Sequence, residues 1–232
     1  RRLSAVLCAQ GLRTGRHRVR RLMREHGLRA LWRRKFVRTT DSGHALPVSA
    51  NVLARRFNPS GPNQAWVSDI TYIRTRSGWL YLAVVLDLYA RKVVGWAMAP
   101  TMHAELVCAA LQLAIAQRQP TPGLIVHSDR GSQYASALHQ ALLARHSLVG
   151  SMSRKGNCWD NAVMERFFLS LKTERVWQRD YANHAEAMTD IADYIVGFYN
   201  SVRLHSKLGN LPPNAFEQQS AIKQPIVVSE KT

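Results

Sequence analysis

The sequence predicts an α/β protein in which a mixed five-stranded sheet is flanked by helices and preceded by a small helical region. Three observations lead to this class. Between residues 66 and 98, short runs of β-branched and aromatic residues are separated by brief turns, which is typical of an antiparallel meander. Helix-like and strand-like stretches then alternate up to residue 200. Residues 1–60 hold 15 Lys and Arg against 2 acids and lack this alternation, so they form a separate region.

Composition sets the wider limits. The chain has 232 residues, of which 46% are hydrophobic, and can bury a sizeable core. Its formal net charge of +17 indicates a polyanionic partner, with nucleic acid as the leading candidate. No apolar run approaches the ~18 residues of a spanning helix, and three widely separated cysteines argue against a disulfide scaffold or a zinc finger. We therefore expect a cytoplasmic protein that has no membrane partner.

Residues 1–32 are interpreted as a partial helix-turn-helix DNA-binding region. Two short helices are expected on either side of Gly11, at Arg2–Gln10 and Thr14–His26, with Thr14 as the second N-cap. In this motif, the start of the second helix meets base edges. The expected DNA-binding residues are Arg13, Arg16, His17, Arg18 and Arg20. The alternative is a solvated basic face that adds only nonspecific affinity, because arginines alone do not distinguish backbone contact from base readout.

Residues 33–62 are interpreted as a basic linker, since Gly and Pro residues interrupt any sustained period there. The sequence begins with Arg1 rather than Met. We therefore expect the N-terminal region to be processed, fused to an upstream segment or cut from a longer reading frame. An upstream-frame DNA-binding partner or a fusion is one way to supply the missing recognition.

Residues 63–218 are expected to form the core, with a tail at residues 219–232. Strands are expected at Trp66–Ile73, Trp79–Asp87, Val93–Met98, Leu124–Ser128 and near Leu148–Ser151. Helices are expected at Glu105–Arg118, Ser136–His146, Trp159–Trp177 and Ala185–Asn200. Hairpin turns make the first three strands antiparallel. The helix that follows them brings the fourth strand back parallel to an earlier one.

Three acidic residues of the core are candidates for one reaction centre. Asp69 lies in the middle of a strand, where an ionised carboxylate is costly to bury unless a metal or a partner holds it. Asp129 follows a strongly apolar strand, at the position where open α/β sheets present ligand-binding groups. Glu165 lies on a long helix, separated from Asp129 by 35 residues, and can return over the sheet toward both aspartates. The alternative is that the three acids are structural residues with fortuitous spacing.

Three carboxylates at one point repel one another and raise each other's pKa unless divalent cations neutralise them. Mg²⁺ or Mn²⁺ is expected, because hard ions prefer oxygen ligands and no His/Cys set for zinc is nearby. Two ions per site, about 4 Å apart, would stabilise the attacking and leaving oxygens of an in-line displacement at phosphorus. A basic protein with such a site is expected to be a polynucleotide phosphoryl-transfer enzyme.

Five ordered motifs run through residues 61–216. They are Trp66-Val-Ser-Asp69-Ile-Thr-Tyr72, Leu86-Asp-Leu-Tyr-Ala-Arg-Lys-Val-Val-Gly-Trp96, His127-Ser-Asp129-Arg-Gly-Ser-Gln-Tyr134, Ser153-Arg-Lys-Gly-Asn-Cys-Trp-Asp-Asn-Ala-Val-Met-Glu165-Arg-Phe-Phe, and Tyr199-Asn200 with Arg203, His205, Leu208-Gly209 and Pro212-Pro213. In these motifs the chain resembles the integrase-core transposases of bacterial insertion sequences, specifically the larger reading-frame product of the insertion-sequence family three group. The basic N-terminal region looks like the helix-turn-helix segment that precedes that core.

This resemblance implies a retroviral-integrase-like, RNase H-like fold with a DDE triad on Asp69, Asp129 and Glu165. It also implies a DNA transposase that cleaves a strand with water and then uses the freed 3′-hydroxyl for strand transfer at insertion-sequence ends. The family has a basic residue seven positions after the Glu, which here is Lys172. Seven residues are nearly two helical turns, so Lys172 lies on the same face as Glu165 and can reach phosphate. A solvated lysine is the alternative.

The remaining DNA-binding candidates are Arg154, Lys155, Lys172 and Arg203. Asp160 and Asn161 are expected to cap the catalytic helix and to order the loop before it. The expected partners are the terminal inverted repeats, target DNA and further copies of the chain on paired ends, in a nucleoid-associated bacterial setting. Two rival functions stay open: a noncatalytic DNA-end-binding remnant or repressor, and an RNase H-like nuclease. The long interval between Asp129 and Glu165 favours the integrase-like branch.

Overall fold

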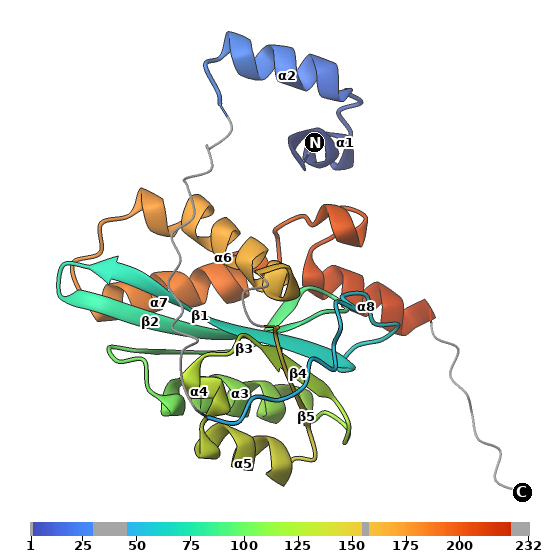
Figure 1. Cartoon of the computed structure of the whole chain (residues 1–232). Coiled ribbons are helices and arrows are strands. Elements are labelled where there is room, and N and C mark those ends of the chain that lie inside the picture. Colours follow the sequence, from blue (N-terminus) through green and yellow to red (C-terminus); the bar gives the residue numbers. More distant parts are fainter. Residues whose placement is uncertain (1, 30–45, 155–157, 224–232) are drawn as a thin grey trace, which may run out of the picture.

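The structure is a computed structural model that describes residues 2–29, 46–154 and 158–223. These residues form a five-stranded sheet with helices on both faces, and a pair of helices at the N-terminal end (Figure 1). The expected mixed sheet flanked by helices is therefore confirmed. Across the three described ranges, no helix combines the length and the apolar character needed to cross a membrane.

The sheet has the strand order β3-β2-β1-β4-β5. Its strands are β1 (Ala65–Thr75), β2 (Gly78–Asp87), β3 (Lys92–Ala99), β4 (Ile125–Ser128) and β5 (Val149–Met152). The first three strands pair antiparallel, as the hairpin turns predict. β4 pairs parallel to β1, and β5 pairs parallel to β4. The parallel pairing follows from the intervening helices, which return the chain to the same end of the sheet at which the earlier strand began.

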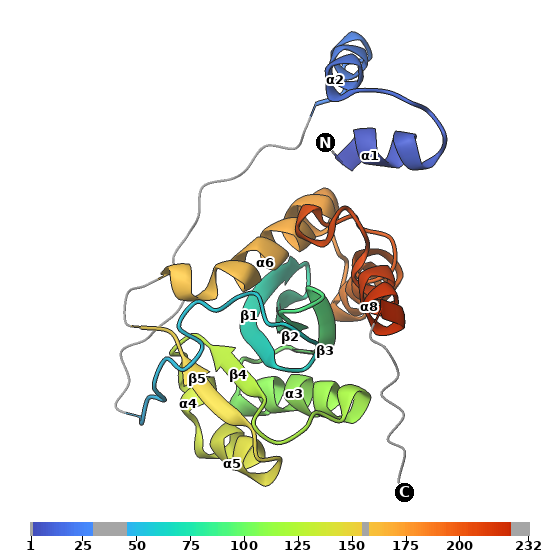
Figure 2. The ribbon, with the colours of Figure 1, turned by 90° about the vertical axis from the view of Figure 1, so that its right-hand side faces the viewer.

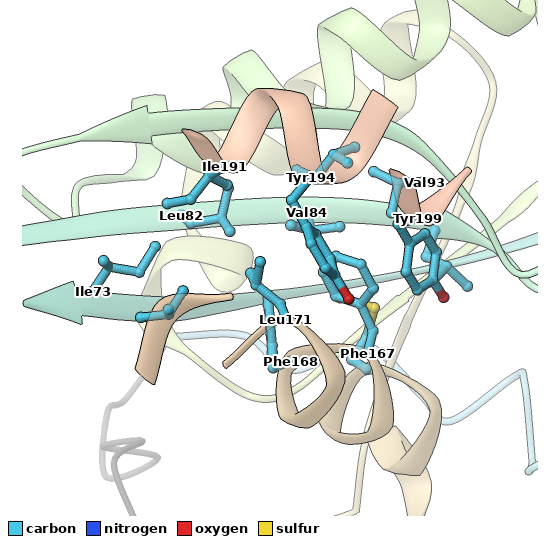
Figure 3. Packing of buried hydrophobic residues seen from close by; sticks show 14 of the residues in the cluster. Ile73, Leu82, Val84, Val93, Phe167, Phe168, Leu171, Ile191, Tyr194 and Tyr199 are labelled. Atoms are coloured by element: carbon cyan, nitrogen blue, oxygen red, sulfur yellow. The ribbon is translucent and has the colours of Figure 1, made fainter. Parts of the chain in front are cut away.

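Helices cover both faces of this sheet (Figure 2). One face packs against α3 (Ala104–Arg118), α4 (Ser132–Ala135) and α5 (Ala137–Arg145). The other face packs against α6 (Ala162–Glu174) and α7 (His184–Asp193), while α8 (Pro213–Lys223) follows further along the chain. Figure 3 shows the second core, where Leu82 and Val84 of β2 meet Phe167 and Leu171 of α6. Alternating side chains of the central strands therefore fill two separate cores.

Gly95 on β3 allows α3 to lie close to the sheet. A Cβ atom at this position would clash with the backbone carbonyl oxygen of Ala110 and lie 2.7 Å from the Cβ of Ala114. Any larger residue would therefore push the helix away from the strand. This close approach explains the glycine in the motif that spans Leu86–Trp96.

Several element boundaries differ from the expectations. The long helix expected at Trp159–Trp177 is α6 with a 3₁₀ turn at each end, Cys158–Asn161 and Val176–Gln178. The helix expected at Ala185–Asn200 changes from α7 to a π-helical segment at Tyr194–Tyr199. Part of the expected tail belongs to α8. Local hydrophobic periodicity does not distinguish these tighter and wider turns from a regular helix.

The N-terminal helices are α1 (Arg2–Ala9) and α2 (Arg16–Glu25). The expectation that Thr14 caps the second helix is wrong, because Gly15 occupies the N-cap position and no side chain caps it. The hydroxyl of Thr14 is instead buried without a hydrogen-bond partner. Gly11, in the turn between the helices, has a φ of +85°, which glycine adopts without strain.

The second half of the expected linker packs against the core. Residues 33–45 of that linker lie outside the described residues. Residues 46–64 form turns and bends without a regular helix or strand. Leu53 in this segment is only 1% exposed and belongs to the core shared with α6. The segment before β1 therefore packs against the sheet through the buried side chain of Leu53.

Candidate active site

The sheet brings two of the predicted carboxylates together. Asp69 lies in the middle of β1, and Asp129 comes directly after β4. Val67 of β1 pairs with His127 of β4, and both strands run in the same direction. Two residues further along each strand, the same register places Asp129 next to Asp69. Their adjacency therefore follows from the parallel pairing of two strands that are distant in the sequence.

The third carboxylate comes from α6, which lies across the same region of the sheet (Figure 2). The pKa of Asp69 is raised well above its usual value, first by burial, then by the charge of Asp129, and further by the charge of Glu165. A hydrogen bond from the Ile70 backbone and the charge of Lys172 act in the opposite direction. The structure thus brings together all four residues that were expected to form the reaction centre.

Asn161 holds Asp69 in place. Its side-chain Nδ2 donates a 2.9 Å hydrogen bond to Oδ2 of Asp69, and the Ile70 backbone N–H donates to Oδ1 at 2.8 Å. The Oδ1 atom of Asn161 is buried and has no hydrogen-bond partner. Asn161 occupies the expected N-cap position of α6, but the expectation that its side chain caps the helix is wrong, because it makes no cap hydrogen bond. Its amide serves the active-site carboxylate instead.

The turn after β4 supports Asp129. The backbone N–H of Gly131 donates a 2.9 Å hydrogen bond to Oδ1 of Asp129. A Cβ atom at Gly131 would lie 3.0 Å from the same oxygen, closer than side chains normally approach. Glycine at this position therefore leaves the carboxylate room while its backbone orients it.

Two buried hydroxyl groups lie near the aspartates. The hydroxyl oxygens of Ser68 and Tyr134 are 3.0 Å apart. Burial raises the pKa of Tyr134 well above its usual value, and the charges of Asp69 and Asp129 raise it further. Tyr134 is therefore a neutral hydrogen-bonding group rather than a proton acceptor.

Asp160 orders the start of α6 by connecting three segments. Its fully buried carboxylate accepts hydrogen bonds from the backbone and the guanidinium of Arg154, from Arg55 and from Asn51. The Arg154 guanidinium is the main cause of the lowered pKa of Asp160. This network joins the segment before β1 to the segment after β5. The expected ordering role of Asp160 is confirmed, and Arg154, a predicted DNA-binding residue, is part of the same ion pair.

Lys172 lies on the same helix as Glu165, near the opposite end. Its Nζ atom is 4.6 Å from the centroid of the Tyr72 ring on β1. Burial lowers the pKa of Lys172, and the negative charge of Asp69 opposes that shift. The ammonium group is therefore close enough to Asp69 for their charges to interact. This position connects the carboxylates to an aromatic group that the sequence analysis did not select.

The other predicted DNA-binding residues lie in two kinds of environment. Arg13, Arg16, His17, Arg18 and Arg20 are exposed on the N-terminal helical pair. Arg203 is only 9% exposed, and its guanidinium donates to both carboxylate oxygens of Glu174 at 2.7 and 2.8 Å. These contacts favour a structural role for Arg203. Lys155 lies outside the described residues.

The donor chemistry of the site fits a hard divalent cation. Among the residues that the structure describes, no three His, Cys, Asp or Glu side chains already form an ion-binding group. The raised pKa of Asp69 nevertheless indicates negative charge that the surrounding protein does not compensate. Carboxylate oxygens, together with the partnerless amide oxygen of Asn161, are ligands of the type that Mg²⁺ prefers.

Sequence comparisons follow the same division of the chain. Residues 59–158 and 148–213 match two integrase core domain families, and residues 1–36 match an HTH-like domain. The chain is 48% identical over 219 residues to "Transposase InsF for insertion sequence IS3A" of Escherichia coli K12, covering 94% of this chain and 76% of that protein. It is 46% identical over 219 residues to the "Insertion element IS600 uncharacterized 31 kDa protein" of Shigella sonnei, covering 94% and 80%.

Solved structures support the fold independently. A chain of the simian T-cell lymphotropic virus intasome in complex with PP2A regulatory subunit B56 gamma matches with a TM-score of 0.60 at 17% identity, covering 82% of this chain and 63% of that chain. The HTLV-2 integrase catalytic core domain in complex with magnesium, in its trimeric form, matches with a TM-score of 0.54 at 14% identity, covering 69% and 99%. These likenesses confirm the expected retroviral-integrase-like fold.

Proposed function

The chain belongs to the integrase-core transposases of IS3-type insertion sequences and shares their DNA transposase function, so we propose that Asp69, Asp129 and Glu165 form its reaction centre. The observation that supports the proposal is the placement of Asp69 on β1 and of Asp129 directly after the neighbouring parallel strand β4. The charges of Asp129 and Glu165 both raise the pKa of Asp69, as expected for neighbouring carboxylates. The arrangement fits a polynucleotidyl transferase that places a phosphodiester over the middle of β1 and the end of β4.

We propose that Mg²⁺ or Mn²⁺ is bound by the three carboxylates, with two ions in each site. The magnesium in the HTLV-2 integrase core supports this choice, because that protein has the same fold. When bound, such ions activate the attacking water or 3′-hydroxyl and stabilise the leaving oxygen. The protein's part is orientation: Asn161 and the Ile70 backbone hold Asp69, and the Gly131 backbone holds Asp129.

Lys172 completes the reaction centre on the side of α6. We propose that its ammonium group contacts a phosphate next to the scissile bond, because it lies over the Tyr72 ring and its charge interacts with that of Asp69. A cation at this position would balance the charge that develops on the phosphate oxygens. Water and the 3′-hydroxyl are the only nucleophiles needed, so no covalent protein–DNA intermediate forms.

The N-terminal helices are proposed to recognise the element ends. The exposed residues Arg13, Arg16, His17, Arg18 and Arg20 would contact phosphates and base edges of the terminal inverted repeats. Several copies of the chain would hold two ends together and engage target DNA. A viral chain with the same fold was solved as part of an intasome. An upstream-frame partner or a fused segment would complete recognition. The protein would act at the bacterial nucleoid in the cytoplasm.

A strand-transfer assay tests the proposed function. The full chain is incubated with labelled duplex that carries the terminal sequence of its element, in Mg²⁺, in Mn²⁺ and in chelator. Cleaved and joined DNA products are expected only with metal. DNA that is bound but not cut would support the remnant or repressor, and cleavage confined to RNA–DNA hybrids would support the nuclease.

Three substitutions assign the residues. Asp69→Asn, Asp129→Asn and Glu165→Gln should each lower cleavage and joining by about 10³-fold or more while end binding persists. Asp180→Asn is the matched control, because this acid is 74% exposed and pairs with Arg76 at the surface. Substantial turnover in any of the three variants would remove that residue from the reaction centre.

A further inference from the structure

A free strand edge lies next to the candidate reaction centre. β4 pairs with β1 only through Ala65, Trp66 and Val67. Within the described sheet, the part of β1 that follows Asp69 therefore pairs with β2 on one side and has no neighbouring strand on the other. In Figure 1 this end of the β1–β2 hairpin extends outward past α3 and α5. A ligand that leaves the carboxylates in this direction would pass the hairpin.

Two aromatic residues occupy this end of the hairpin. The rings of Tyr72 on β1 and Trp79 on β2 are in perpendicular contact, with centroids 5.1 Å apart. Trp79 is 48% exposed, whereas Trp66 is buried and Tyr72, Tyr81 and Trp96 are half-buried. An isolated exposed aromatic residue needs no explanation. This one is in contact with a second ring, that of Tyr72, over which Nζ of Lys172 lies.

Lys172 connects the aromatic pair to the carboxylates. Its Nζ atom lies over the Tyr72 ring, and its charge interacts with that of Asp69. The exposed Arg74, two residues after Tyr72, adds a second positive charge to the same strand. Cationic groups interleaved with aromatic rings are typical of surfaces that bind single-stranded nucleic acid, where cations contact phosphates and rings stack on bases. The surface therefore has the chemistry of a nucleotide site and is continuous with the reaction centre.

We propose that Tyr72 and Trp79 form a stacking platform for an unpaired base of the DNA strand whose phosphate lies at the reaction centre. The proposal rests on the proposed function, since it takes the position of that phosphate as given. Lys172 would contact the phosphate while the rings hold the neighbouring base outside the duplex. Stacking uses the π face that every base has, so the platform would tolerate different bases and would favour ends that open easily.

A fluorescent base analogue tests the platform. The probe is an element-end duplex that carries 2-aminopurine at one terminal position at a time, with either a blunt end or a few unpaired terminal nucleotides. The full chain carries Asp129→Asn, so that the DNA is bound without being cut. Binding should change the fluorescence strongly at one or two positions next to the scissile phosphate. Trp79→Ala should abolish that change and weaken binding of the unpaired-end duplex by about 10-fold.

Two variants provide the controls. Trp79→Phe keeps a ring and should retain most of the fluorescence change and affinity, which separates stacking from a general effect on the hairpin. Leu138→Ala removes a 49% exposed apolar side chain from α5 on the opposite face of the sheet from α6 and should have no effect. Thermal unfolding of each variant shows whether the hairpin still folds.

The results separate this proposal from the proposed function. If the wild-type chain cuts and joins ends but Trp79→Ala changes neither fluorescence nor affinity, the platform is overturned and the reaction centre is unaffected. Equal loss of affinity for blunt and unpaired-end duplexes would also overturn it, because stacking on an unpaired base predicts a difference. If the wild-type chain neither binds nor cuts the ends, both proposals fall together.

Discussion

The two ends of α6 hold half-buried acids in opposite electrostatic environments. Near its N-terminal end, Glu165 meets Asp69 and Asp129, and the pKa of Asp69 is raised by burial and by both neighbouring carboxylates. At its last residue, burial would raise the pKa of Glu174, but hydrogen bonds and charge from Arg203, with further donors, lower it instead. The N-terminal half of α6 therefore lies beside an acid whose pKa is raised, Asp69, and its last residue is an acid whose pKa is lowered, Glu174.

This difference distinguishes a reaction centre from a structural network. Glu174 accepts hydrogen bonds from Arg203, from the Tyr194 hydroxyl at 2.8 Å and from Arg2 of α1 at 3.0 Å. Paired in this way, its charge joins α6 to the segment after α7 and to the N-terminal helices. Asp69 accepts hydrogen bonds from two neutral groups, the Asn161 amide and the Ile70 backbone, and its pKa is still raised. Strongly perturbed acids of this kind are typical of functional sites.

The largest effect on stability is expected when the ion pair between Arg203 and Glu174, at the C-terminal end of α6, is removed. Arg203→Ala leaves Glu174 and Ser170 without their main buried donor, and the free energy of unfolding should fall by about 3–5 kcal/mol. Chemical denaturation measures it. The control is Arg76→Ala, whose partner Asp180 is 74% exposed, so the loss should be at most about 1 kcal/mol. Unchanged stability with weakened DNA binding in Arg203→Ala would restore Arg203 as a phosphate contact.

A smaller effect, on rate rather than on folding, is expected at Lys172, which lies between the two ends. Lys172→Ala should lower the rate of strand transfer by about 10²-fold, since a cation near the reacting phosphate is lost. Its contact with Tyr72 contributes only about 0.5–1 kcal/mol to folding. Single-turnover kinetics and thermal unfolding, measured together, test this contrast. Lys172→Arg should recover part of the rate, and a rate unchanged in Lys172→Ala would favour a solvated lysine.

The smallest effect is expected from neutralising the acid cluster. Asp69→Asn should raise the free energy of unfolding at neutral pH by about 0.5–2 kcal/mol, because it removes a charge that folding destabilises. The amide of Asn161 can rotate so that its partnerless Oδ1 accepts a hydrogen bond from the new Asn side chain.

The pH dependence of that gain in stability tests the direction of the shift in the pKa of Asp69. Because the folded-state pKa of Asp69 is raised, wild-type stability from this group is greatest when the carboxyl is protonated and is lost as the pH rises through that pKa. The gain from Asp69→Asn should therefore shrink as the pH falls. Glu174→Gln should behave oppositely, with a loss of stability that is largest at neutral pH and vanishes in acid. A gain in stability that does not change with pH would mean that the pKa of Asp69 is not raised in the folded protein.

The sequence by itself determined the strands, most of the helices and the choice of the acids that are proposed for the reaction centre. Strand periodicity and turn residues are local properties, and an acid in an apolar strand is conspicuous without any structure. The five motifs added the expected fold and the basic residue at Lys172. These signals depend on residues that are close in sequence, or on the spacing of residues along a single helix, such as Glu165 and Lys172.

Only the tertiary structure decided which polar groups serve these acids. Asn161 is 92 residues from Asp69, and its position before α6 suggested a helix cap rather than an active-site donor. Arg203 resembled a DNA contact because an arginine has the same sequence signal whether it meets phosphate or a buried Glu174. Tyr72 and Trp79 gained significance only when Lys172 reached across from α6. Partner choice depends on packing between distant segments, and local sequence patterns carry no information about that packing.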